Sequence, residues 1–142
     1  MSDNALADTP FNHKACTVPG YEDCWVRFKT SGYPKRLRRE WDSAGSNLTL
    51  EIITRYIEAW QMRDLQASLL EFADVRSNAI ERAEMEKRAD DMTLTAAERT
   101  KARKKLDGLP DALGDVEDAV IIWLIRTFKD FWLAELTAPR KN

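Results

Sequence analysis

Histidine, glycine and long apolar runs are scarce in this sequence, and each shortage excludes a class of function. His13 is the only histidine among the 142 residues, so a serine or cysteine nucleophile has almost no candidate base. The five glycines are isolated, and neither G-x-x-x-x-G-K nor G-x-G-x-x-G occurs, so no phosphate-binding loop is expected. We therefore predict a protein that is not an enzyme and that uses no cofactor.

Cysteine is also rare, and the charges nearly balance. Cys16 and Cys24 lack C-x-x-C spacing and, with His13, offer only three soft ligands, so no metal site is predicted. A formal net charge of −2 gives no general attraction to nucleic acid or to an anionic membrane. The N-terminal segment lacks the basic and apolar regions of a signal peptide, which indicates a cytoplasmic protein.

The N-terminal part of the chain predicts an arm followed by one strand. Residues 1–22 have no periodicity and are expected to be extended or disordered. Residues 24–30 alternate in the way typical of a strand. Val26 and Phe28 lie on one face, and Trp25, Arg27 and Lys29 lie on the other. A lone strand leaves backbone groups unpaired, so it needs the arm, a second copy or a partner's edge beside it.

The rest of the chain predicts a mainly α fold, a small helical bundle that occupies residues 23–138 as a single domain, with a tail at 139–142. Tyr56, Ile57 and Trp60 continue the helical stripe of the residues before them. Helices are accordingly expected over residues 34–44, 48–63 and 115–136.

Residues 76–107 differ from the rest because charged side chains dominate them. Between Glu81 and Lys105, 14 of 25 residues are charged, so this stretch cannot form a core. Thr95 and Glu98 have the spacing of a capping box, which predicts the start of a helix. We expect a charged helical hairpin that is inserted in the domain and projects from its core.

The last predicted helix carries apolar residues around most of its circumference. Its longest unbroken apolar run, Ala119–Ile125, is far shorter than the roughly 20 residues of a bilayer span, so no membrane partner is expected. Its aromatic rings exceed what one core face can use, which favours a partner or self-association. Tryptophan, tyrosine and arginine dominate interface hot spots. The predicted partner-binding residues are Trp25, Tyr33, Arg36, Arg39, Trp41, Tyr56, Trp60, Trp123, Phe128, Phe131 and Trp132.

Two basic clusters leave nucleic acid open as an alternative partner. They are Lys35–Arg39, which includes Arg36, Arg38 and Arg39, and Lys101–Lys105. A helix with three or four cations neutralises few phosphates and binds weakly and nonspecifically. Since both clusters also suit a solvated helix face, we disfavour nucleic acid as the main partner.

The order of short motifs resembles the small tail assembly chaperones of long-tailed (siphovirus-type) bacteriophages. The resemblance covers about residues 23–65 and 109–136, and the charged stretch between Ser68 and Asp107 departs from it. The motifs that carry it are a strand with Trp25, then Gly32-Tyr33-Pro34, Leu37–Trp41, Trp60–Leu65, Leu109-Pro110 and the apolar C-terminal helix.

The resemblance implies a non-catalytic helical protein of the host cytoplasm. Such a chaperone binds the tape-measure protein, or another tail protein, and keeps its hydrophobic helices soluble until the tail tube assembles around them. Helix-in-groove binding of an amphipathic client agrees with the apolar C-terminal helix. Two alternatives stay open: a small nucleic-acid-associated accessory protein, and a structural subunit of a virion or tail that forms a homo-oligomer.

Overall fold

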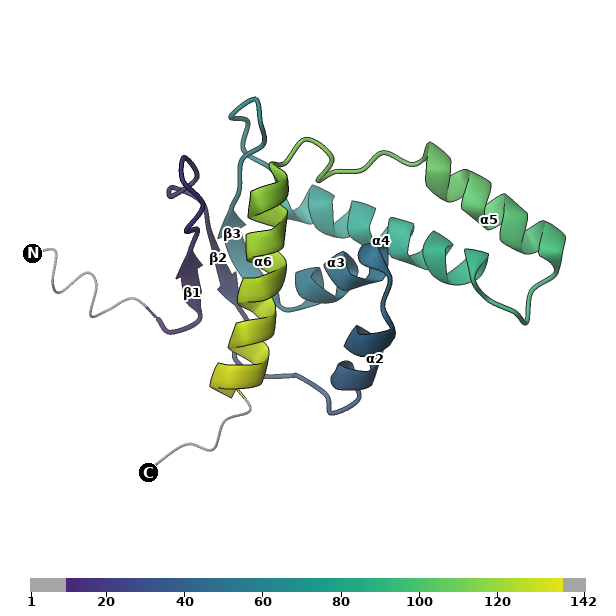
Figure 1. Cartoon of the computed structure of the whole chain (residues 1–142), viewed down its shortest axis with the longest axis horizontal. Helices are drawn as coiled ribbons and strands as arrows, with labels where there is room; N and C mark the ends of the chain where they lie inside the picture. Colours follow the sequence, from purple (N-terminus) through teal and green to yellow (C-terminus); the bar gives the residue numbers. More distant parts are fainter. Residues whose placement is uncertain (1–9, 137–142) are drawn as a thin grey trace, which may run out of the picture. The chain divides into compact units, whose positions relative to one another are not determined.

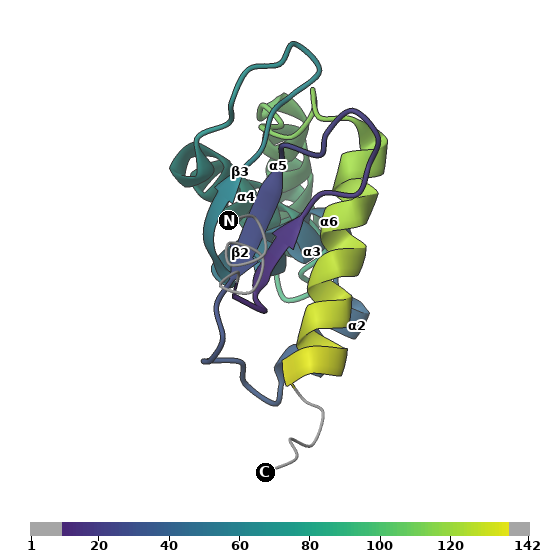
Figure 2. The same ribbon diagram turned by 90° about the vertical axis from the view of Figure 1, so that its left-hand side faces the viewer.

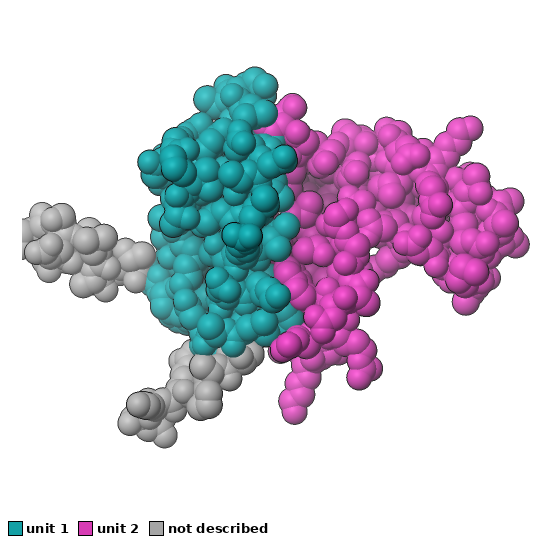
Figure 3. Space-filling view, in the orientation of Figure 1, with its two compact units in different colours: residues 1–32, 56–69, 116–142 teal, residues 33–55, 70–115 magenta. Residues whose placement is uncertain are grey.

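The computed structural model describes residues 10–136, which form two compact units (Figure 3). Unit 1 comprises residues 1–32, 56–69 and 116–142, and unit 2 comprises residues 33–55 and 70–115. The first nine residues of the predicted arm and the predicted tail at 139–142 lie outside the described residues. One domain over residues 23–138 stays a prediction.

Unit 1 is built on a three-stranded antiparallel sheet with β2 in the middle (Figure 1). The strands are β1 (His13–Ala15), β2 (Trp25–Phe28) and β3 (Ile57–Gln61). The prediction of a single strand is therefore wrong. β2 is hydrogen-bonded within the chain, on one side to β1, which belongs to the predicted arm, and on the other side to β3.

β3 occupies residues that the sequence predicts as the end of a helix. The helix before it, α3 (Ser46–Arg55), ends at Arg55, so the helix predicted over residues 48–63 is wrong beyond that point. Ile57 and Trp60 fit a helical stripe, but aromatic and β-branched side chains also suit a strand that finds a partner. Here Trp60 pairs with Val26 and Ile57 with Phe28, across a register shift in β2.

The C-terminal helix packs on one face of this sheet. It consists of α6 (Asp118–Asp130), which runs alongside the strands in Figure 2, and a π-helical end, η1 (Phe131–Leu136). Phe28 of β2 is fully buried, and its ring centroid lies 5.5 Å from that of Phe128 and 5.3 Å from that of Phe131. Tyr56 stacks on Phe128 from the segment before β3, at 6.1 Å.

Burial of these rings overturns the expectation that the C-terminal helix has more apolar surface than the chain can cover. Trp123 is 8% exposed, Phe128 0% and Trp132 4%. On the described part of this helix, Ile122 is the large apolar side chain that remains exposed, at 49%. The predicted fold lacked β1 and β3, which extend the sheet on either side of β2.

Unit 2 is a set of four helices. They are α2 (Leu37–Ser43), α3, α4 (Phe72–Ala89) and α5 (Ala96–Gly108). The helices α4 and α5 are those of the predicted charged hairpin, and α4 begins somewhat earlier than expected. The predicted capping box is confirmed, because Thr95 Oγ1 accepts from Glu98 N at 3.1 Å and Glu98 Oε1 accepts from Thr95 N at 3.0 Å.

A charged network ties α2, α3 and α4 together inside unit 2. Glu51 is 7% exposed and accepts hydrogen bonds from Arg55 at 2.7 Å and Arg76 at 2.7 Å. Arg55 also donates two bonds to Glu40, at 2.8 and 2.9 Å. Burial alone would raise the pKa of Glu51, but the bonds from Arg55 and Arg76 outweigh it and hold that pKa below its usual value.

The fold is therefore helix-rich but mixed, with five α-helices and a small sheet among the described residues. The mainly α prediction is confirmed in part: helices dominate, while the core of unit 1 also depends on strands. Whether the charged hairpin is an insertion stays a prediction.

Candidate partner-binding surface

The face of β2 opposite the C-terminal helix carries polar and aromatic side chains. Side chains alternate along a strand, so burial of Val26 and Phe28 under α6 and η1 turns Trp25 and Arg27 to the other face. Both Trp25 and Arg27 are half-buried. The described helical segments of unit 1 pack on the Phe28 side, so among residues 10–32, 56–69 and 116–136 no helix covers Trp25.

Strand register brings two more side chains to this face. His13 of β1 is the partner of Arg27, and Gln61 of β3 is the partner of Trp25. Directly paired residues of antiparallel strands share a face. We call His13, Trp25, Arg27 and Gln61 the Trp25 platform. Its centre is an indole ring with polar groups on either side.

Contacts within the Trp25 platform fix the indole in place. The His13 ring centroid lies 4.7 Å from that of Trp25, and Arg27 Cζ lies 5.5 Å from the Trp25 ring centroid. Arg27 Nη2 donates to His13 Nδ1 at 3.2 Å. This bond requires an imidazole whose Nδ1 carries no proton.

The electrostatics of the platform agree with a neutral His13. Burial lowers the pKa of His13, and the positive charge of Arg27 lowers that pKa further. The ring is therefore neutral at pH 7 and can accept from Arg27. Arg27 Nε is buried and has no hydrogen-bond partner among residues 10–136, so the guanidinium is only partly satisfied.

A second aromatic and cationic contact borders the platform beyond Gln61. The Arg63 guanidinium carbon lies 4.4 Å from the Tyr21 ring centroid, and Arg63 Nε lies 3.1 Å from Asp23 Oδ2. The bond from Arg63 lowers the pKa of Asp23. Gln61 Nε2 donates to the Asp23 carbonyl at 2.8 Å, which links this contact to the platform.

The predicted partner-binding residues are divided between the two units. In unit 1, Trp25 and Trp60 are half-buried on opposite faces of the sheet. Five others lie in the core of unit 1, so their apolar surface is not offered to a partner in this conformation. These five are Tyr56, Trp123, Phe128, Phe131 and Trp132.

The remaining predicted residues belong to unit 2, in and before α2. Arg36 and Arg39 are exposed, whereas Tyr33 and Trp41 are half-buried. Arg36 and Arg39 help to line a shallow groove of about 720 Å³. Lys35 and Arg38 line the same groove, and its one carboxylate, Asp42, lies 3.8 Å from Arg38, so the groove is cationic overall.

The sequence predicted Arg27 on the same strand face as Trp25, and the alternating burial of β2 confirms this, but His13 and Gln61 were missed as neighbours of Trp25. Alternation along a strand is a local pattern, so the face of Arg27 could be predicted without knowledge of the rest of the fold. The positions of His13 and Gln61 depend on the register of β1 and β3, which the sequence did not predict.

Comparison with protein-family profiles, with curated proteins and with solved structures found no match for this chain. Among the described helices, none has both the length and the apolarity that crossing a membrane requires. Within residues 10–136, no group of three or more histidine, cysteine, aspartate or glutamate side chains is placed to hold a metal ion.

Proposed function

We propose that this chain is a non-catalytic binding protein of phage tail assembly. It keeps the tape-measure protein, or another tail protein, soluble in the host cytoplasm. The order of motifs from Trp25 through Tyr33 and Trp60 to the C-terminal helix supports this proposal, because it resembles that of tail assembly chaperones.

The observation that carries the proposal is the Trp25 platform. Its indole offers a flat apolar surface, and Arg27 adds a cation beside it; tryptophan and arginine are both enriched in interface hot spots. An amphipathic client helix would place an apolar side chain on Trp25 and an acidic one near Arg27. We therefore propose that the client binds to the sheet, and not to the C-terminal helix as the sequence alone suggested.

Co-expression with a tape-measure fragment from the same phage genome tests this proposal. The wild-type chain should raise the soluble fraction of the fragment and bind it after purification. Trp25→Ala should weaken that binding by about 2 kcal/mol, which is roughly 30-fold in Kd, as expected for a central interface tryptophan.

Trp41→Ala is the matched control, because Trp41 is also a half-buried tryptophan but belongs to unit 2. It should change the Kd less than about twofold. A fragment that is equally soluble without this chain would refute the chaperone function. Loss of binding in Trp41→Ala but not in Trp25→Ala would be consistent with the chaperone function but would refute the Trp25 platform as the client-binding surface.

A further inference from the structure

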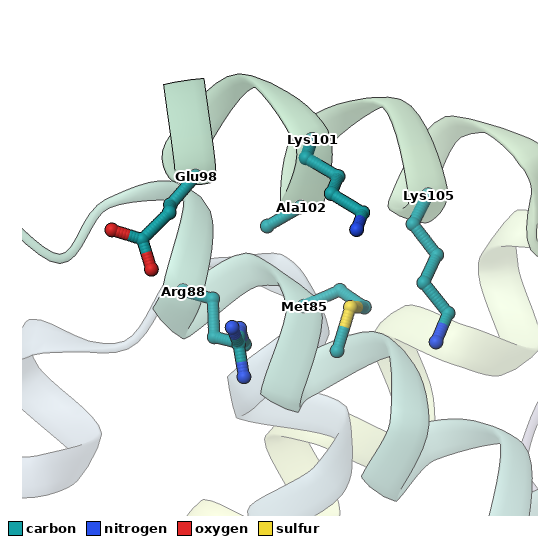
Figure 4. A pocket seen from close by; sticks show the side chains of 6 residues that line it. All are labelled: Met85, Arg88, Glu98, Lys101, Ala102 and Lys105. Carbon is teal, nitrogen blue, oxygen red and sulfur yellow. The ribbon is translucent and has the colours of Figure 1, made fainter. Parts of the chain in front are cut away.

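The two charged helices of unit 2 enclose a groove that the proposed function does not use. Its volume is about 330 Å³, near the lower end of the range for small-ligand sites. Figure 4 shows the side chains around the space between α4 and α5. The groove is lined by Met85 and Arg88 of α4 and by Glu98, Lys101, Ala102 and Lys105 of α5.

Helical spacing explains why apolar and cationic groups share this groove. Residues three or four apart lie on one helix face, so Lys105 shares a face of α5 with both Lys101 and Ala102. Ala102 is 5% exposed and Met85 is 8% exposed, so both lie where the helices pack. The longer lysine side chains extend from α5 toward α4 above this apolar contact (Figure 4).

Among the described residues, the cations of the groove make no side-chain hydrogen bond or close ion pair, unlike other arginines of the same hairpin, and the charge of Arg88 acts on Glu98 and Asp91 only without such a contact. Arg82 donates to the Leu109 carbonyl at 3.1 Å, and Arg103 donates to the Ala89 carbonyl at 3.2 Å. In contrast, the described residues provide no side-chain hydrogen bond and no ion pair for the cations that line the groove. These cations are Arg88, Lys101 and Lys105.

The one carboxylate of the groove is already engaged elsewhere. Glu98 Oε1 accepts from Thr95 N at 3.0 Å and from Thr95 Oγ1 at 2.9 Å, as part of the capping box. In Figure 4 its carboxylate points away from the two lysine ammonium groups. The bonds from Thr95 lower the pKa of Glu98, with a smaller contribution from the charge of Arg88. Three positive charges and one negative charge thus leave the groove at +2.

We propose that this groove binds the phosphate group of a nucleoside phosphate or of a nucleic-acid backbone. Phosphate presents several acceptor oxygens, and the Arg88 fork with two lysine ammonium groups matches them better than it matches a single carboxylate. Bringing like charges together is unfavourable unless an anion joins them, and the apolar floor limits screening by water. This site is independent of the Trp25 platform.

The test measures the binding of two probes by wild-type protein and by two double variants. The probes are inorganic pyrophosphate, followed calorimetrically, and a fluorescent single-stranded 12-mer of deoxythymidine, followed by anisotropy at low salt. The groove variant is K101Q/K105Q. The control is K87Q/K104Q, which removes the same charge from exposed positions of α4 and α5 that do not line the groove.

We expect K101Q/K105Q to lose about tenfold or more in affinity and K87Q/K104Q less than about twofold. Displacement of the 12-mer by pyrophosphate would place both probes in one site. Binding of pyrophosphate alone indicates a free phosphate ligand, and binding of the 12-mer alone indicates a nucleic-acid backbone. Both outcomes support the proposal, which concerns the shared phosphate chemistry.

Three outcomes would overturn it: equal losses in the two double variants, no binding of either probe by the wild-type protein at low salt, or equally tight binding of poly-glutamate. Circular dichroism checks that both variants are folded, which is expected because the replaced lysines are exposed. R88Q provides a second groove variant and should also weaken binding.

Discussion

Replacing Phe128 by alanine should destabilise the protein strongly, because this ring lies at the centre of the unit 1 core. Phe128 is fully buried and contacts the rings of Phe28, Tyr56 and Trp132, at centroid distances of 5.5, 6.1 and 5.9 Å. Removing a buried phenylalanine costs about 3–5 kcal/mol, and three ring contacts place this site near the upper end. A domain is typically stable by about 5–15 kcal/mol, so the loss is a large fraction.

Urea denaturation followed by circular dichroism and tryptophan fluorescence measures this loss. A cost of about 4 kcal/mol corresponds to a Tm lower by about 12–16 °C for a chain of this length. If Phe128→Ala does not fold, Phe128→Leu should still fold and cost about 1–2 kcal/mol. Ile122→Ala is the control on the same helix, since Ile122 is 49% exposed and should cost under about 1 kcal/mol. Equal costs at Phe128 and Ile122 would refute the burial of the C-terminal helix.

Three further predictions concern the charged network, the capping box and the thiols. Glu51→Gln removes the charge that Arg55 and Arg76 neutralise, so it should cost about 2–4 kcal/mol in urea denaturation at pH 7. The pKa of Glu51 is lower in the folded than in the unfolded protein, so this stabilisation is fully present above the unfolded pKa of about 4.3. It should be lost as the pH falls from that value through the folded pKa. A cost of Glu51→Gln that stays constant down to pH 3 would contradict this prediction. Thr95→Ala should cost about 1 kcal/mol and speed amide exchange at the start of α5, and Thr95→Ser should restore both. Burial raises the pKa of the Cys16 thiol, so this thiol should react slowly with a chromogenic disulfide in native protein and rapidly after unfolding. Fast labelling of Cys16 in native protein at pH 8 would contradict this prediction.

The features that the sequence predicted correctly depend on local patterns. The capping box of Thr95 and Glu98 places both partners within one helical turn, so it can be recognised without knowledge of the rest of the fold. Alternation of Val26 and Phe28 likewise identified β2. These signals are visible in a short window of sequence.

The features that were missed depend on contacts between distant segments. Ile57 and Trp60 fit a helix and a strand equally well, and their pairing with β2 decides the outcome. β1 has only three residues, His13–Ala15, and no pattern of its own. Without β1 and β3, the sequence could not show what covers the C-terminal helix.

The Trp25 platform was predicted only in part, because two of its four residues reach it through contacts between distant segments. Trp25 was identified by residue type, and it is partly exposed. Phe128 and Trp132 were also chosen by residue type, but aromatic side chains serve cores as well as interfaces. His13 became a neighbour of Trp25 only through strand register.

The central claim is that the sheet of this chain covers its own C-terminal helix. Hydrogen–deuterium exchange of the purified chain at about 1 and 20 µM tests this claim most directly. Amides of α6 should exchange slowly at both concentrations, because Trp123 and Phe128 are buried without any partner chain. Rapid exchange of α6 at the lower concentration, with protection that appears only at the higher one or after a client is added, would contradict the claim.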